Sequence, residues 1–360
     1  MGFLQLLENA ITYIQQVQTR HDQLGRTLRE NGKKGLNPNS LEKNIEKTLT
    51  TKILKTVNEG KIAGIDSGFA GQSFYSLDLM LLRTVGTCFT YDQGKLSSSM
   101  YYPETLSLPE PIINTQGLER EEFHKFVSLK RLQAEIQNAT HLIENHSPDA
   151  CFIDGSLILH PMDKPGNESK LHPMYNQTIR DFVALYQAAE KKNCILIGAV
   201  EDSRSTRLSE MLHAQEMITI QKNETLSDTT LLDKALHAGE RSMVFSLAEN
   251  VEKHTILMDF PKEWAHKLHA CYVKPSQWDF PLRIEFLSTP EKAIEQADRV
   301  SAIAFAQSSL HKDYAFPSVL IEADMRAGLK QEEVELVSDK ILSKLGRHTL
   351  RLKRRDRRPF

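Results

Sequence analysis

The sequence is poor in several residue types, and each shortage excludes a class of protein. Its 360 residues include only four cysteines, and none of them forms a Cys-x-x-Cys pair. This spacing argues against a disulfide framework or a zinc site and suits buried free thiols in a reducing compartment. No run of residues approaches the roughly 18 apolar residues of a membrane helix, and no basic segment precedes an apolar one at the N-terminus. We therefore expect a cytoplasmic protein with no membrane association.

An excess of charge of one sign is also missing. The 45 Lys and Arg residues nearly balance the 47 Asp and Glu residues, which gives a net charge of −2 at pH 7. Any contact with DNA or RNA must therefore come from local basic patches and not from the overall charge. The length suits one large domain or two ordinary ones, and the composition is that of a globular protein.

Two short apolar runs end in an aspartate that small residues follow. One is KIAGIDSG at 61–68 and the other is ACFIDGSL at 150–157. Each run predicts a buried strand closed by a turn, with Asp66 or Asp154 at the carboxyl end of its strand. Either aspartate alone could serve only the turn, because aspartate caps its own backbone. The repetition favours two carboxylates at one edge of a sheet, where a hard divalent cation can be held beside a phosphodiester.

The pattern of the first 58 residues predicts a helical extension that precedes the core. Apolar residues recur at helical spacing over residues 1 to about 30, and a polar segment over about 41–58 predicts a second helix. The apolar face of the first helix either packs on its own domain or docks another subunit, and the sequence leaves both open. The other end, residues 346–360, is a strongly basic tail, typical of a solvated segment, that could also supply phosphate contacts.

Between these ends, residues 59–345 alternate strand and helix patterns, which predicts an α/β fold with some parallel strands. The clearest helix spans 119–146 and carries Glu135 near its apolar face. This carboxylate is either a solvated boundary residue or the third oxygen donor of a metal site. Residues 92–117 are rich in proline and serine, and we expect a loop or an insertion there.

In their order along the chain, these pieces resemble the NurA nuclease family. The matching segments are AGIDSG at 63–68, the helix bearing Glu135, FIDGSL at 152–157, the strand pair within 272–285, and LIEADMRA at 320–327. The resemblance implies an RNase H-like core over 59–345, with a mixed central sheet flanked by helices. It also implies a Mn²⁺- or Mg²⁺-dependent deoxyribonuclease with 5′–3′ exonuclease and single-strand endonuclease activity. Such a nuclease would work in double-strand break end resection, as a homodimer and with a HerA-type hexameric ATPase.

The same resemblance assigns roles to four acids. Asp66, Glu135 and Asp154 match the family's metal-binding acid positions, and Asp324 falls where many relatives carry a histidine. Aspartate is a competent ligand for Mg²⁺ or Mn²⁺. We expect the four carboxylates to hold two cations, of which one lowers the pKa of an attacking water and the other stabilises the leaving oxygen.

Two basic residues, Arg204 and Lys274, are candidate contacts to the DNA strand, and ordinary surface cations are the competing interpretation. Glu201 and Asp202 stand where relatives often carry a lysine. Together with Asp324, this departure supports an alternative function. The chain would then be a catalytically degenerate protein of the same fold that only binds DNA ends or a translocase.

Overall fold

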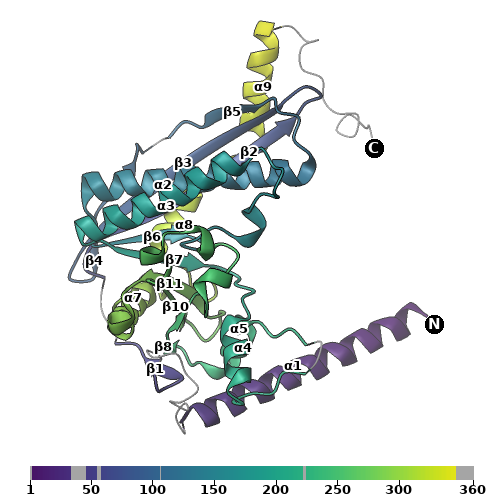
Figure 1. Ribbon diagram of the computed structural model, residues 1–360, viewed down its shortest axis with the longest axis vertical. Helices are drawn as coiled ribbons and strands as arrows, with labels where there is room; N and C mark the ends of the chain where they lie inside the picture. Colours follow the sequence, from purple (N-terminus) through teal and green to yellow (C-terminus); the bar gives the residue numbers. More distant parts are fainter. Residues whose placement is uncertain (1, 34–45, 55–57, 106, 222–223, 346–360) are drawn as a thin grey trace. The chain divides into compact units, whose positions relative to one another are not determined.

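The computed structural model divides the chain into two compact units, and each unit contains paired β-strands (Figure 1). Unit 1 comprises residues 1–58, 197–251 and 262–318, and unit 2 comprises 59–196, 252–261 and 319–360. The structure describes residues 2–33, 46–54, 58–105, 107–221 and 224–345. The predicted basic tail at 346–360 lies outside these residues. The predicted segment boundaries at 58 and 345 remain predictions.

Strand β2 (Gly60–Ser73) is the central strand of the mixed sheet in unit 2. It pairs antiparallel with β3 (Asp78–Asp92) along its whole length and parallel with β6 (Ala150–Asp154). On its other side β3 pairs antiparallel with β4 (Lys95–Tyr102) and with β5 (Glu110–Asn114). The combination of parallel and antiparallel pairs with flanking helices confirms the predicted mixed α/β architecture.

We expected a loop or an insertion over 92–117, and the loop is wrong, because β4 and β5 lie within this segment. Most residues of β4 are exposed, and its sequence, KLSSSMYY, lacks the apolar alternation of a half-buried strand. The pairing with β3, and not a local pattern, therefore makes this segment a strand.

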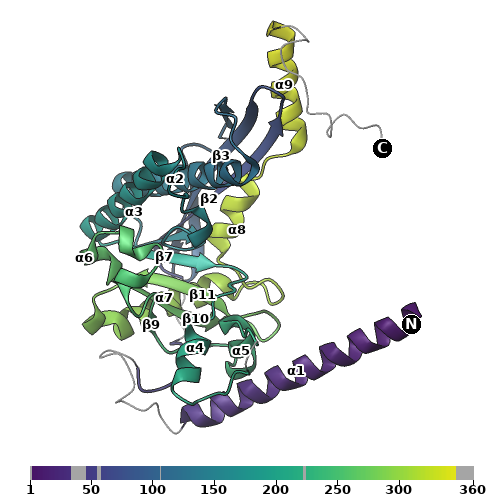
Figure 2. The same ribbon diagram turned by 45° about the vertical axis from the view of Figure 1, so that its right-hand side comes forward.

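Two helices cover opposite faces of β2. Helix α2 (Arg120–His146) contacts β2, β3 and β6 and lies beside α3 (His172–Lys192) (Figures 1 and 2). A Cβ atom built on Gly86, the β3 partner of Ile65, would lie 2.6 Å from Leu142 of α2. Helix α8 (Ser318–Ala327) packs close to Gly64 and Gly68. These two glycines lie on the face of β2 opposite to that of Ile65, because side chains alternate along a strand. Helix α9 (Gln331–Leu345) continues along β2 and packs on Phe74 and Leu79.

The strands of unit 1 are joined by antiparallel pairs in the order β1-β8-β10-β11-β7. β9 also pairs with β10, and the strand bounds are Thr50–Lys52 (β1), Ile195–Val200 (β7), Glu240–Ser242 (β8), Phe245–Ser246 (β9), Leu268–Lys274 (β10) and Leu282–Leu287 (β11). The prediction of a second helix over 41–58 is wrong in its described part, because the β-branched Thr50 and Thr51 pair with β8. The remaining helices are α4 (Arg207–Ala214), α5 (Asp228–Ala235), α6 (Lys262–Ala265) and α7 (Ala293–Ser308), with 3₁₀ turns at Pro161–Asp163, Val251–Lys253, Leu257–Asp259 and Pro290–Lys292.

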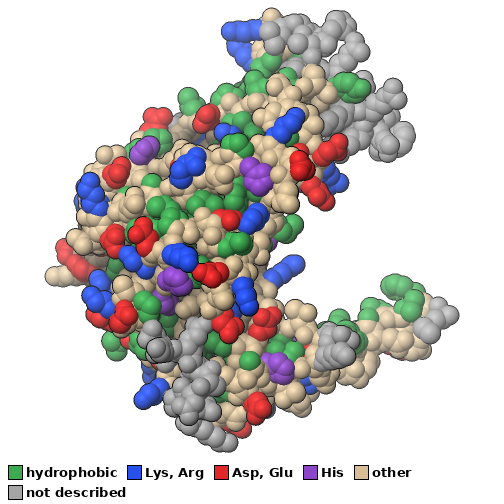
Figure 3. Space-filling model, viewed as in Figure 1, with side chains coloured by type: hydrophobic (Ala, Val, Ile, Leu, Met, Phe, Trp, Pro, Cys, Tyr) green, Lys and Arg blue, Asp and Glu red, His purple; other side chains and the backbone are tan. Residues whose placement is uncertain are grey.

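The predicted N-terminal helix is present as α1 (Phe3–Lys33), and its two halves differ in packing. The C-terminal half packs on α5, whereas the N-terminal half projects beyond it (Figures 1 and 2). Hydrophobic side chains are visible at this projecting end in Figure 3. The exposed hydrophobic residues of this half include Phe3, which is 77% exposed, and Leu4, Leu7, Ile11 and Ile14.

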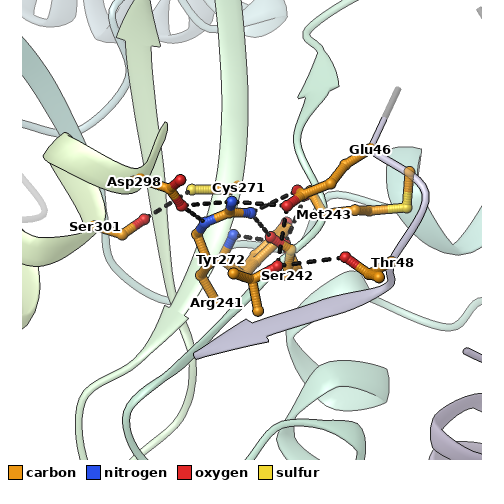
Figure 4. A network of polar contacts seen from close by, with 10 residues as sticks. Glu46, Thr48, Arg241, Ser242, Met243, Cys271, Tyr272, Asp298 and Ser301 are labelled. Carbon is orange, nitrogen blue, oxygen red and sulfur yellow. Dashed lines mark hydrogen bonds and ion pairs between the residues drawn. The ribbon is translucent and has the colours of Figure 1, made fainter. Parts of the chain in front are cut away.

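A buried arginine anchors the sheet of unit 1 (Figure 4). Arg241 of β8 is 1% exposed, and its guanidinium donates to both carboxylate oxygens of Glu46, at 2.6 and 2.8 Å. It also donates to Oδ1 of Asp298 on α7, at 2.6 and 2.8 Å. These bonds tie α7 and Glu46, four residues before β1, to β8. All four cysteines are free and buried, as the spacing predicted. No helix within the described ranges is both long and apolar enough to cross a membrane.

Candidate active site

Asp66 and Asp154 lie at corresponding positions of two neighbouring strands. β2 and β6 run parallel, and their register pairs Ile65 with Ile153, so that the next residue on each strand is an aspartate. Corresponding residues of adjacent parallel strands point to the same face of a sheet, and the strands are about 4.8 Å apart. The two carboxylates therefore lie side by side, as the repeated sequence pattern suggested.

The prediction that Asp66 ends its strand is wrong. β2 continues for seven residues beyond Asp66 to Ser73, because its pairing with β3 extends from Gly60 to Ser73. Asp154, in contrast, is the last residue of β6, and Gly155 follows it with a φ of +107°, which is accessible to glycine but strained for other residues. One acid thus projects from the middle of a strand and the other from the end of its neighbour.

Two glycines bring α8 onto the face of β2 that carries Asp66. A Cβ atom on Gly64 would lie 2.8 Å from the backbone of Val319, and one on Gly68 would lie 2.2 Å from the carbonyl oxygen of Ala327. Because side chains alternate along a strand, Gly64, Asp66 and Gly68 share one face. Asp324 lies on α8 between these two contacts, and it is exposed.

Asp66 is only 4% exposed. Burial raises its pKa most, and the charges of Asp154 and Asp324 raise it further, to about 7. The backbone N–H of Ser67 donates to Oδ1 of Asp66 at 2.7 Å and opposes this rise, as does the charge of Arg131. Asp66, Asp154 and Asp324 thus form one electrostatic cluster.

Glu135 reaches this cluster from the other side of β2. It is 4% exposed, and the Ser67 hydroxyl donates to its Oε1. Ser67 follows Asp66 and so alternates to the face that α2 covers. Burial raises the pKa of Glu135 to about 7, and the charge of Asp66 contributes to the rise.

Arg131 connects these groups and is a residue that the sequence prediction missed. It donates from Nε to the Ser67 hydroxyl at 3.3 Å and from NH2 to the Ser67 carbonyl at 3.1 Å. The same NH2 lies 3.5 Å from Oε1 of Glu135, and the guanidinium carbon lies 5.5 Å from the ring centroid of the exposed Phe69. Its position one helical turn before Glu135 was the available signal, since residues i and i+4 face each other on a helix.

The donor set suits a hard divalent cation. Within the described ranges, no three His, Cys, Asp or Glu side chains lie close enough together to hold a metal ion in the present arrangement. β6 and α8 nevertheless both border β2, and the charges of Asp154 and Asp324 raise the pKa of Asp66. Carboxylate oxygens are the ligands that Mg²⁺ and Mn²⁺ prefer, and a cation would relieve the repulsion that raises the pKa of Asp66.

The two predicted DNA contacts belong to unit 1. Arg204 is exposed in the segment between β7 and α4. Lys274, at the end of β10, is buried and forms an ion pair with Asp233. It lines a cavity of about 520 Å³ together with Arg26 and His237. Of the two, only Arg204 is presented at the surface, and both roles remain predictions.

Comparison with known proteins gives one family and several related folds. The family model described as NurA domain matches residues 60–329. The crystal structure of the NurA nuclease from Sulfolobus solfataricus has 13% sequence identity and a TM-score of 0.56, covering 97% of this chain and 98% of that chain. A crystal structure of NurA bound to dAMP and manganese has 10% identity and a TM-score of 0.46, covering 85% and 91%. No curated protein matches the chain. The likeness to the Sulfolobus solfataricus structure shows that the two chains share a fold.

Proposed function

Because this chain belongs to the NurA domain family, we propose that it is a metal-dependent nuclease that hydrolyses phosphodiester bonds in DNA. The observation that carries this proposal is the parallel register that sets Asp66 beside Asp154. On the same face, α8 adds Asp324 to the cluster. Asp66 is thus a buried carboxylate with two further acids on neighbouring elements, and a strongly raised pKa of this kind is typical of a functional site.

The acids have different proposed roles at this site. Asp66, Asp154 and Asp324 would hold Mn²⁺ or Mg²⁺, and with Glu135 they offer enough oxygens for two ions. A bound ion would lower the pKa of an attacking water and stabilise charge on the leaving oxygen. Ser67 and Arg131 hold Glu135 in place, so its carboxylate is positioned before any substrate arrives.

The direct test is cleavage of 5′-labelled single-stranded DNA by the Asp154→Asn variant in the presence of Mn²⁺. We expect a loss of at least about 100-fold, because even partners outside the ligand shell contribute up to that much. Glu144→Gln is the matched control, because Glu144 is an exposed carboxylate on α2 away from the cluster. Full cleavage by a folded Asp154→Asn variant would contradict the metal-site assignment.

We propose that the nuclease acts as a 5′–3′ exonuclease and as a single-strand endonuclease. Family membership supports this assignment. Circular single-stranded DNA separates the two activities, because only an endonuclease can open it. Duplexes labelled at either the 5′ or the 3′ end give the polarity. Release of 5′-terminal nucleotides first is expected, and initial release from the 3′ end would refute the polarity.

We also propose a HerA-type hexameric ATPase as the partner in DNA end resection, contacted through the projecting half of α1. The support is the row of exposed apolar side chains there, including Phe3, Leu7 and Ile11. Leu7→Glu combined with Ile11→Glu should abolish co-purification with such an ATPase. Size-exclusion chromatography with light scattering of the same variant tests the expected homodimer. A loss of the dimer with intact ATPase binding would assign this helix to self-association instead.

The second candidate function is DNA-end or translocase binding without cleavage. It is favoured by the finding that no three potential ligands among the described residues are within metal-binding distance of one another. Thermal unfolding with and without Mn²⁺ separates the candidates, since a ligand that binds only the folded state raises the melting temperature. A Mn²⁺-independent melting temperature together with absent cleavage would establish the second candidate.

A further inference from the structure

Unit 2 contains a cavity of about 380 Å³ that none of the predicted site residues lines. Its walls come from β3, from the segment between β4 and β5, and from α8. The volume lies within the range of small-molecule binding sites. We call it the Arg83 pocket after the arginine on β3, and its other main lining residues are Val85, Ser107, Glu322, Met325 and Arg326.

The Arg83 pocket lies on the same face of the sheet as the acidic cluster. The antiparallel register pairs Asp66 with Val85 and Gly68 with Arg83. Paired residues of antiparallel strands point to the same face and lie about 5 Å apart. On α8, Met325 and Arg326 directly follow Asp324. The pocket is therefore next to the carboxylates on two sides, through β3 and through α8.

Arg83 presents an incompletely bonded guanidinium to this pocket. Its side chain is 13% exposed, and it donates to the Gly328 carbonyl at 3.0 Å and to Glu333 at 2.6 Å. Its Nε atom is buried and has no hydrogen-bond partner in the part of the chain that the structure describes. A buried donor without a partner is unfavourable, so an anion in the pocket would offer Arg83 a further hydrogen-bond acceptor.

A second cation and a hydroxyl complete the polar lining. Arg326 lies with its guanidinium carbon 4.0 Å from the ring centroid of Tyr101, and it donates to Glu322 at 2.8 Å. The Ser107 hydroxyl is buried, and no described residue bonds to it. Two guanidinium groups thus face one lining carboxylate, Glu322, which Arg326 already neutralises.

The lining also has an apolar part. Val85 and Met325 line the pocket together with these cations. A site with cations and a hydroxyl beside an apolar wall matches one unit of a nucleic acid strand, in which a phosphate joins a sugar and a base. A simple anion would use only the polar half of such a lining.

We propose that the Arg83 pocket binds a nucleotide of the DNA strand adjacent to the scissile phosphodiester, with Arg83 and Ser107 contacting its phosphate. This inference rests on the proposed nuclease function, which supplies the strand as the ligand. Binding here would fix the register of the strand relative to the carboxylates. Arg83 is in this sense a positioning residue.

Two variants that break the same ion pair test this role. Arg83→Gln removes the cation, whereas Glu333→Gln removes only its carboxylate partner. The affinity for a fluorescein-labelled single-stranded oligonucleotide is measured in EDTA, where no cleavage occurs, at several salt concentrations. We expect Arg83→Gln to raise Kd about tenfold or more and to lower the slope of log K against log salt by about 0.7, one phosphate contact. Glu333→Gln should bind as the wild type does.

Equal effects of Arg83→Gln and Glu333→Gln would overturn the proposal, because Arg83 would then only fasten the start of α9. Ser107→Ala provides a second test that does not depend on the ion pair. Since no described residue bonds to the Ser107 hydroxyl, its loss should leave folding unchanged and weaken oligonucleotide binding about threefold or more. Unchanged binding by Ser107→Ala and Arg83→Gln together would also overturn it.

Competition with dAMP and with inorganic phosphate separates the possible sources of the phosphate. If Arg83→Gln weakens binding of inorganic phosphate but not of the oligonucleotide, the pocket is a free-anion site and the proposal is wrong. Cleavage with Mn²⁺ is scored separately. A wild type that binds DNA through Arg83 but cleaves nothing would refute only the nuclease function, and normal cleavage with Arg83-independent binding would refute only the pocket.

Discussion

Burial of the ionised Asp66 carboxylate destabilises the folded chain. Replacing Asp66 with asparagine should make this destabilisation measurable. The side-chain amide introduced by Asp66→Asn would keep an oxygen that accepts from the Ser67 N–H and would remove the negative charge. In the absence of metal, we expect the variant to have a larger free energy of unfolding than the wild type. Its nuclease activity should be lost at the same time.

The magnitude follows from the pKa of Asp66. Burial and the charges of Asp154 and Asp324 raise it from 3.8 to about 7. Between these values the folded chain keeps a proton that the unfolded chain has released, so the free energy of unfolding falls as the pH rises. At pH 8 the full effect is about 4 kcal/mol at most. Because the neighbouring carboxylates share this repulsion, we expect a gain of about 1–4 kcal/mol at pH 8 and about a third of that at pH 5.

Hydrogen exchange of the β2 and β6 amides, followed in EDTA at pH 5 and pH 8, measures this gain locally. Both tryptophans, Trp264 and Trp278, belong to unit 1, so their fluorescence would report on the wrong unit. Glu144→Gln controls for the loss of an exposed carboxylate and should change the protection little.

A faster exchange of β2 in Asp66→Asn than in the wild type at pH 8 would refute this account of Asp66. The carboxylate would then be a net stabilising group, bonded well enough to offset its burial. A gain that is the same at pH 5 and pH 8 would also refute it, because the effect would not follow the protonation of Asp66.

Three further results are expected from the structure. Mn²⁺ should stabilise unit 2 more at pH 8 than at pH 6, because at pH 6 protons compete with the metal ion for the Asp66 carboxylate. Melting curves of the wild type and of Asp66→Asn with and without Mn²⁺ test this. Gly68→Ala should lower the free energy of unfolding by about 1–3 kcal/mol and remove most of the activity, because the added methyl group pushes α8 away. Gly166→Ala is the control in urea unfolding and should leave this free energy unchanged, because a Cβ atom there would have nothing within 4 Å. Arg241→Met should destabilise unit 1 by about 3–5 kcal/mol in tryptophan-monitored unfolding, and Arg20→Met, which breaks a half-exposed ion pair, by less than about 1 kcal/mol.

The part of the site that the sequence predicted is the part that local patterns encode. The runs ending in Asp66 and Asp154 are short, apolar and β-branched, so their strand character and burial follow from composition alone. That two such strands become parallel neighbours in matching register depends on the rest of the sheet. The repetition of the pattern was the only hint, and the register that pairs Ile65 with Ile153 is followed by an aspartate on each strand.

The errors have a common physical origin in long-range pairing. Ser67, Gly68 and Gly71 are turn-forming residues, and they nevertheless continue β2 because β3 supplies hydrogen bonds along its whole length. The exposed strand β4 has no apolar alternation and is likewise determined by its neighbour. Tertiary context overrides local propensity in both cases.

The contacts around Glu135 were not predictable for a related reason. Its partner Ser67 is 68 positions earlier in the chain, and only the packing of α2 on β2 brings them together. Arg83 did leave a signal. It is a lone cation in the apolar run DLMLLRTVG of β3, and such a residue inside a buried strand usually has a partner or a function.

The alternation of β2 explains how one strand can serve both stability and chemistry. Its face towards α2 carries Ile65, which is fully buried, and Ser67, which holds Glu135. Its face towards α8 carries Asp66 between two glycines that admit the helix. A shift of one residue in the pairing with β3 would exchange these faces and bury Asp66 against α2. The long ladder with β3 prevents this shift, so the segment beyond Asp66, which looked like a turn, keeps the carboxylate on the correct face.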